Sequence, residues 1–64
     1  MNNNISTFRK KEGMTQVELA NKLGIQRTYL SEIETGKATP SMKLSMRISL
    51  LLRQPMDKIF YPQV

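Results

Sequence analysis

Near the middle of the chain lies its densest group of side chains able to recognise another molecule: Gln26, Arg27, Thr28, Ser31 and Glu32. An arginine presents a forked donor that matches O6 and N7 of guanine, and a glutamine amide can pair with N6 and N7 of adenine. Thr28 can contact a thymine methyl group or donate to a phosphate, and Ser31 can donate or accept. Glu32 can accept from N4 of cytosine, repel phosphate in a wrong register, or hold Arg27 in position. These side chains are suited to reading base edges.

Catalysis is disfavoured by the residues that the chain lacks. It has no Cys and no His, which removes thiolate nucleophiles, the imidazole base and the usual soft metal ligands. The carboxylates are scattered along the sequence: Glu12, Glu18, Glu32, Glu34 and Asp57. No nucleophile and base pair can be assembled from them. We therefore expect a protein that is not an enzyme, with no cofactor, no metal and no evident small-molecule ligand.

Length and charge set the scale of the molecule and the kind of partner. Sixty-four residues allow one domain, 1–64, with a small core held by helix packing. The net charge of +5 and the pI near 10.0 predict attraction to polyanions, although charge alone does not separate nucleic acid from an anionic membrane surface. No apolar run is long enough to cross a bilayer, and residues 1–4 lack the pattern of a signal peptide. We expect a cytoplasmic protein.

The first of two helices that must position the polar group is expected over residues 16–23. Thr15 and Glu18 have the spacing of a capping box. Gly24 ends the helix, because glycine adopts the left-handed conformation at a helix C-terminus without steric cost. The stripe expected to face inward comprises Val17, Leu19, Ala20 and Leu23.

The second of these helices is expected over residues 26–35, after Ile25 as a buried plug. Only Leu30 and Ile33 are expected to face inward, which leaves the polar group exposed. A helix, a glycine turn and a second helix with exposed polar residues at its N-terminal end are typical of a helix-turn-helix. On this pair alone, the simpler interpretation is two helices of a small bundle whose polar face meets water.

Three further helical segments complete the expected all-α fold. One covers residues 5–12, after residues 1–4, which we expect to be frayed. Another covers residues 42–52 behind the N-cap Ser41, and Pro55 opens a final turn over 56–60. In the 42–52 helix, the residues assigned to packing are Met42, Leu44, Met46, Ile48, Leu51 and Leu52.

The order of residues from Thr15 onward favours the helix-turn-helix interpretation. The chain reads T-Q-x-E-L-A-x-K-L-G-I-x-R-x-x-L-S-x-I-E-x-G-K, followed by x-x-P-S. It resembles, nearly residue by residue, the phage repressor/Cro-type or Xre-like helix-turn-helix regulators, and the resemblance covers residues 5–60. The resemblance implies a compact five-helix bundle of lambda-repressor-like type and a bacterial or phage origin. It also implies a transcriptional regulator, such as a repressor, that binds specific double-stranded DNA.

The resemblance assigns roles to residues outside the polar group. The family's counterpart of Gln16 contacts a phosphate, from the N-terminus of its helix. Arg9 matches a family arginine that pairs with the glutamate found here at Glu34, which would join the first helix to the reading helix. Weaker candidates for phosphate contacts are Asn21, Tyr29, Thr35, Lys37 and Lys10. Lys10 and Lys37 fit equally well as ordinary solvated lysines.

A self-complementary patch is expected toward the C-terminus. Its candidate residues are Leu50, Met56, Phe60 and Tyr61, and the alternative is that they cap the core. Small family members commonly pair through this region, so the resemblance favours a homodimer, with the tail 61–64 in or near its interface. Two reading helices about 34 Å apart would then face a pseudo-palindromic operator. Two alternatives remain, a protein-interaction module of the same fold (antitoxin-like or repressor-antagonist) and a restriction-modification controller.

Overall fold

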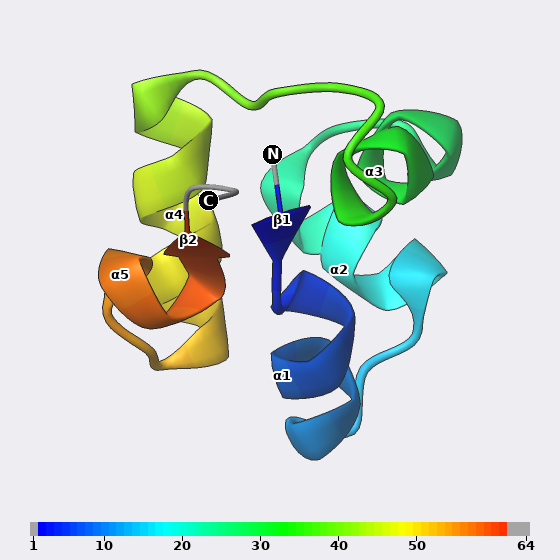
Figure 1. The fold of residues 1–64 in the computed structure, drawn as a ribbon. Coiled ribbons are helices and arrows are strands. Elements are labelled where there is room, and N and C mark those ends of the chain that lie inside the picture. Colours follow the sequence, from blue (N-terminus) through cyan, green and yellow to red (C-terminus); the bar gives the residue numbers. More distant parts are fainter. Residues whose placement is uncertain (1, 62–64) are drawn as a thin grey trace.

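The computed structural model describes residues 2–61, and for Asn2 only the backbone. Within this range five helices are joined by short turns, with a short strand at either end (Figure 1). The helices are α1 (Ile5–Lys11), α2 (Gln16–Leu23), α3 (Arg27–Glu34), α4 (Met42–Leu52) and α5 (Met56–Ile59). The strands are β1 (Asn2–Asn3) and β2 (Phe60–Tyr61). The expected five-helix architecture is confirmed, and none of the helices described is both long and apolar enough to pass through a membrane.

The predicted fraying of the N-terminal residues is wrong for Asn2–Asn3. These residues pair antiparallel with Phe60–Tyr61, so α5 ends at Ile59, one residue before its expected end. The Asn4 amide donates to the carbonyl of Ile59 at 2.7 Å. A polar run gives no sequence signal of this pairing, because its partner lies at the far end of the chain. Met1 and residues 62–64 of the expected tail lie outside the described residues.

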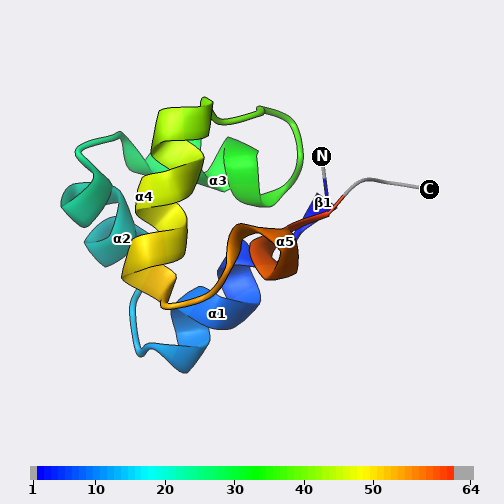
Figure 2. The same cartoon turned by 90° about the vertical axis from the view of Figure 1, so that its left-hand side faces the viewer.

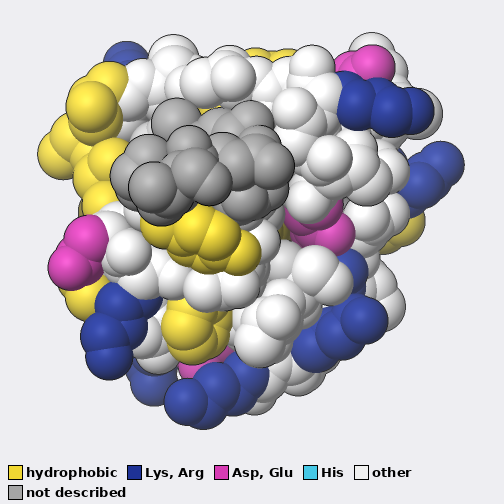
Figure 3. All heavy atoms as spheres, viewed as in Figure 1, with side chains coloured by type: hydrophobic (Ala, Val, Ile, Leu, Met, Phe, Trp, Pro, Cys, Tyr) yellow, Lys and Arg dark blue, Asp and Glu magenta, His cyan; other side chains and the backbone are white. Residues whose placement is uncertain are grey.

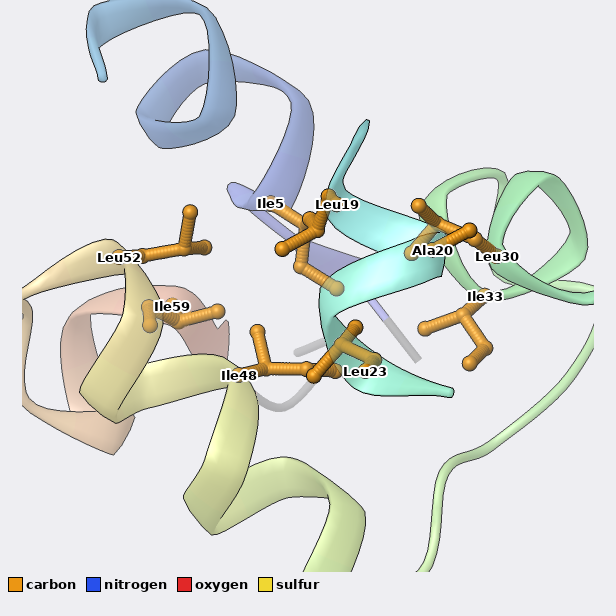
Figure 4. Packing of buried hydrophobic residues seen from close by; sticks show 9 residues of the cluster. All are labelled: Ile5, Leu19, Ala20, Leu23, Leu30, Ile33, Ile48, Leu52 and Ile59. Carbon is orange, nitrogen blue, oxygen red and sulfur yellow. The ribbon is translucent and has the colours of Figure 1, made fainter. Parts of the chain in front are cut away.

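The core lies where the five helices meet, and α2 is at its centre (Figure 4). Figure 4 shows Leu19 beside Ile5 of α1, and Ala20 facing α3. Because alanine is small, α3 can pack closely against this point of α2. The buried apolar residues, each at most 1% exposed, are Ile5, Leu19, Ala20, Leu23, Leu30, Ile33, Ile48, Leu52 and Ile59. This packing fixes the orientation of α3 relative to the rest of the molecule.

Several apolar residues expected to pack inward are instead at the surface. Val17 is 50% exposed, Met42 68% and Met46 52%, and Ile25 is half-buried rather than a buried plug. The inward stripe of α4 is Ser45, Ile48 and Leu52. These positions follow helical spacing, but α4 has more apolar residues than one stripe can hold. Composition alone therefore could not identify which of its faces is inward.

The capping box expected at the start of α2 is present. The Thr15 amide donates to Oε1 of Glu18 at 2.9 Å, and the Glu18 amide donates to Oγ1 of Thr15 at 3.1 Å. Ser41 caps α4 as expected, accepting from the Leu44 amide at 3.1 Å. Gly24 ends α2 with φ of 72°. These interactions join residues at most four positions apart, which is why the bounds of α2 and α4 match those expected.

The capping box predicts a dependence of stability on pH. Hydrogen bonds from the backbone and side chain of Thr15, with a smaller contribution from Lys22, lower the pKa of Glu18. A lowered folded-state pKa gives stabilisation that is present above the ordinary glutamate value of about 4.3 and is lost as the pH falls through the folded pKa. Wild type should therefore melt above Glu18→Gln at neutral pH, and the difference should close on acidification. Thermal unfolding across this range, with the exposed Glu12→Gln as control, checks this; a pH-independent difference contradicts it.

Arg53 ends α4 in the left-handed region, with φ of 59° and ψ of 39°. It is the one non-glycine residue with positive φ among those described. A side chain in this conformation costs about 1 kcal/mol relative to glycine. Arg53→Gly should therefore raise the free energy of unfolding by about 0.5–1 kcal/mol, measured by urea denaturation. Arg53→Ala keeps the Cβ atom and should give no gain; equal effects of the two substitutions would contradict this reason.

Candidate nucleic-acid interface

The polar group lies on the outer edge of α3, at its N-terminal end. Gln26 is the N-cap residue, and Arg27 is the first residue of the helix. Gln26, Arg27 and Thr28 are exposed. Glu32 is exposed one turn further on, and Ser31 is half-buried. Leu30 and Ile33 are buried on the opposite side, so the apolar spacing of α3 turns the polar residues outward.

A buried ion pair holds the other end of α3. Nε of Arg9 donates to Oε2 of Glu34 at 2.9 Å, and Nη2 donates to Oε1 at 3.3 Å. The two side chains are only 9% and 6% exposed. Nη1 of Arg9 donates to the carbonyl of Met14 at 2.9 Å. The expected pair is thus present with two-point geometry, and it joins α1 and the α1–α2 connection to the last turn of α3.

A chain of hydrogen bonds continues from this ion pair to the exposed edge. Nε2 of Gln16 donates to Oε1 of Glu34 at 3.0 Å, and Nη1 of Arg27 donates to Oε1 of Gln16 at 3.4 Å. Both ends of the Gln16 amide are therefore engaged, which fixes its orientation. The acceptor that holds Arg27 is Gln16 and not Glu32, which was one alternative for Glu32.

Sequence reasoning missed the contact between Gln16 and Arg27. Each is the first residue of its helix, Gln16 of α2 and Arg27 of α3. In a helix-turn-helix the first turns of both helices lie at one surface, so their shared N-terminal position was the available signal. The structure thus brings one candidate for a phosphate contact and one for a base contact into a single group.

The other candidates for phosphate contacts are spread over different parts of the surface. Lys37 is exposed in the loop after α3, where Gly36 has φ of 84°. The Thr35 hydroxyl donates to the carbonyls of Ser31 and Glu32, at 3.0 and 3.2 Å, so its proton is used within the helix end. Tyr29 is half-buried and packs against the core. Two more are exposed outside the group formed by the first turns: Asn21 and Lys10.

Charged and apolar side chains occupy different sides of the molecule. In Figure 3, Lys and Arg side chains lie along the right and lower sides, and apolar side chains gather on the left, over α4. Among the residues described, no group of three or more His, Cys, Asp or Glu side chains could hold a metal ion. The exposed edge of α3 therefore offers hydrogen bonds and positive charge for binding.

A family model described as helix-turn-helix matches residues 5–59 of this chain. Among similar proteins is an uncharacterized HTH-type transcriptional regulator of Archaeoglobus fulgidus, 38% identical over 60 residues, which cover 94% of this chain and 86% of the relative. Another of the same description, from Methanocaldococcus jannaschii, is 37% identical over 60 residues, covering 94% and 91%.

A phage protein is also similar over part of its length. The ImmF control region 10 kDa protein of Bacillus phage phi105 is 48% identical over 48 residues, which cover 75% of this chain and 53% of the phage protein. The matched family is one of DNA-binding transcriptional regulators and not of enzymes. The chain therefore belongs to the helix-turn-helix family of transcriptional regulators, in its phage repressor/Cro-type, Xre-like group.

Proposed function

We propose that the protein binds specific double-stranded DNA as a homodimer, with the exposed edge of α3 in the major groove. The observation that carries this proposal is the placement of Arg27. It is exposed at the start of α3, and one of its N–H groups is held by Gln16. The remaining donors have no other protein partner among the described residues, so the guanidinium is both oriented and available.

The base-reading roles follow from side-chain chemistry and from position along α3. Arg27 is placed to bind O6 and N7 of guanine, and Gln26 to bind N6 and N7 of adenine. Thr28, next in the same turn, is suited to a thymine methyl group. Ser31 and Glu32 lie one turn further on and are assigned to flanking base edges, Glu32 to N4 of cytosine.

Phosphate contacts are assigned first to Gln16. One N–H of its Nε2 group is given to Glu34, which leaves the second for a phosphate oxygen beside the first amides of α2. Lys37 and Lys10 supply exposed cations whose attraction to the backbone depends on salt. Asn21, Tyr29 and Thr35 are kept as secondary proposals, Thr35 with the weakest support because its hydroxyl is occupied.

A polar reading edge also favours DNA over a protein partner at this site. An interface with another protein would be expected to have large apolar or aromatic anchors at its centre. The exposed edge of α3 instead presents Gln26, Arg27, Thr28 and Glu32. We therefore do not assign the antitoxin-like or repressor-antagonist alternative to this edge.

We assign the dimer contact to the surface around α5 and β2. A single domain reads only a few base pairs, so pairing two domains is the usual way to obtain a useful site. Met56 and Phe60 are half-buried and Tyr61 is 38% exposed, so they can both cap the core and present apolar surface. Leu50 is 76% exposed on α4 and lines a hollow with Lys22 and Arg47. We therefore separate Leu50 from this patch.

The dimer proposal predicts a change in sedimentation. Wild type should sediment as a dimer without DNA at a concentration on the order of tens of micromolar, and Tyr61→Glu should shift it to a monomer, because a carboxylate would be buried against its own symmetry copy. Val17→Glu adds the same charge at an exposed apolar residue of α2 and is expected to stay dimeric. A wild type that is strictly monomeric under these conditions contradicts the proposed interface.

Selection of bound duplexes from a random-sequence pool tests the whole proposal. The expected product is a motif of two inverted half-sites whose centres are about 10 base pairs, or 34 Å, apart. Enrichment of a single asymmetric motif would contradict the dimer, and no enrichment at all would contradict sequence-specific binding.

A further inference from the structure

The outer face of α4 carries an apolar stripe that the proposed DNA contacts do not use. Met42, Met46 and Leu50 follow one another at every fourth residue and are 68%, 52% and 76% exposed. Single exposed apolar residues are ordinary, but a continuous row along one helix face is typical of an interaction site. Figure 3 shows this side of the molecule as the one where apolar side chains gather.

A groove runs beside this stripe, between α4 and the C-terminal end of α2 with the following turn. It consists of two hollows, one of about 400 Å³ with apolar walls that include Leu23 and Leu44, and one of about 210 Å³ that includes Leu50. Arg47 lines both hollows, and its Nη2 donates to the carbonyl of Lys22 at 3.4 Å. In Figure 2, α4 lies in front with α2 beside it.

Cations border the groove. Lys22, Lys43 and Arg47 line the hollows, and the lining residues in the described part of the chain include no Asp or Glu. Lys22 has Glu18 one turn away on its own helix, but α4 carries Lys43 and Arg47 without any carboxylate. Two copies of this face would bring like charges together. The charge therefore opposes self-association here and favours a partner that carries carboxylates.

We propose that the outer face of α4 and the adjoining groove bind an acidic amphipathic helix of another protein. Apolar side chains of that helix would pack on Met46 and Leu50, and its carboxylates would pair with Lys43 and Arg47 at the border of the groove. The site goes beyond the proposed DNA binding and does not depend on it, because its residues belong to α4 and the end of α2. A regulator with two such surfaces can hold a partner protein while it is on DNA.

Fluorescence anisotropy with a synthetic peptide tests this site on the free protein. The probe is a labelled amphipathic helix of about 18 residues, with Leu on one face and Glu on the other. The control peptide replaces every Glu with Lys. Saturable binding is expected for the Glu peptide alone, and Leu50→Ser should weaken it about tenfold, a loss of about 1.4 kcal/mol. All variants are first checked by thermal unfolding, since the changed side chains are exposed.

A matched pair of charge reversals separates a specific site from general attraction. Lys43→Glu/Arg47→Glu should weaken binding of the Glu peptide by more than about tenfold. Lys10→Glu/Lys11→Glu makes the same change of net charge on α1 and should leave the affinity within about threefold. Equal losses in the two variants, or no saturable binding of the Glu peptide by wild type, overturn the proposal.

Two further outcomes would assign the face to another occupant and would also overturn the proposal. One is tighter binding of phosphatidylglycerol vesicles that is lost in Lys43→Glu/Arg47→Glu. The other is self-association that Leu50→Ser abolishes in sedimentation. Because these measurements use no DNA, their failure and a failure of the proposed DNA binding are independent.

Discussion

Arg9→Met is expected to lower the free energy of unfolding by about 3–5 kcal/mol, because removing one partner of a buried ion pair leaves the other charge without compensation. The stranded group is the Glu34 carboxylate, whose side chain is only 6% exposed. The carbonyl of Met14 loses its donor as well. For a domain of this size the total stability is of the same order, so Arg9→Met is expected to be largely unfolded near physiological temperature.

The double variant Arg9→Met/Glu34→Met separates the two roles of the pair. Replacing both charges by apolar side chains removes the uncompensated carboxylate, so this variant is expected to be clearly more stable than Arg9→Met. Urea denaturation followed by circular dichroism measures both, with the exposed Lys10→Met as control for the loss of a neighbouring cation. A single variant that loses less than about 1 kcal/mol, or a double variant no more stable than the single, would contradict this account of the pair.

Arg27→Ala is expected to cost about 1–3 kcal/mol per half-site on the selected duplex. The loss should be confined to the cognate site, because a two-point contact to guanine discriminates among base pairs. On duplexes in which that base pair is changed, wild type and variant should bind alike. Anisotropy titrations with the selected duplex and its single-base variants measure both effects.

Lys37→Ala is the matched control for loss of positive charge. A phosphate contact carries no sequence information, so this variant should weaken binding to all duplexes by the same factor and reduce the salt dependence by about one phosphate contact per protomer. If Arg27→Ala instead behaved like Lys37→Ala on every sequence, Arg27 would be a phosphate contact and the assigned reading role would be wrong.

Local interactions explain which parts of the fold could be predicted from the sequence. Thr15 and Glu18 form a capping box within four residues, and Ser41 caps α4 through an amide three residues away. Gly24 ends α2 by its own backbone conformation. Such signals do not depend on the rest of the chain, and the helix bounds that they set are correct.

Features that depend on distant segments were missed for the same reason. The β1–β2 pairing joins Asn3 to Phe60, and no local pattern in a polar dipeptide points to so distant a partner. The inward face of α4 was also assigned incorrectly at Met42 and Met46, because apolar residues on several faces leave the choice to packing. Only the neighbouring helices determine that Ser45 is buried there.

The candidate site combines both kinds of information. The exposure of Gln26, Arg27 and Thr28 followed from the apolar spacing of α3. The pair between Arg9 and Glu34, 25 residues apart, was expected from the family resemblance and not from spacing. The link from Gln16 to Arg27 required the packing of α2 against α3. It connects the buried ion pair to the edge that is proposed to read DNA.

The central claim is that the exposed edge of α3 contacts duplex DNA, and an NMR titration tests it most directly. Isotope-labelled protein is titrated with a duplex at low ionic strength, where phosphate attraction is strongest. The account predicts the largest shifts at the amides of Gln26, Arg27 and Thr28, at the Arg27 Nε–H and at the Gln16 side-chain amide. Shifts centred on the outer face of α4, or no shifts at all, would contradict it.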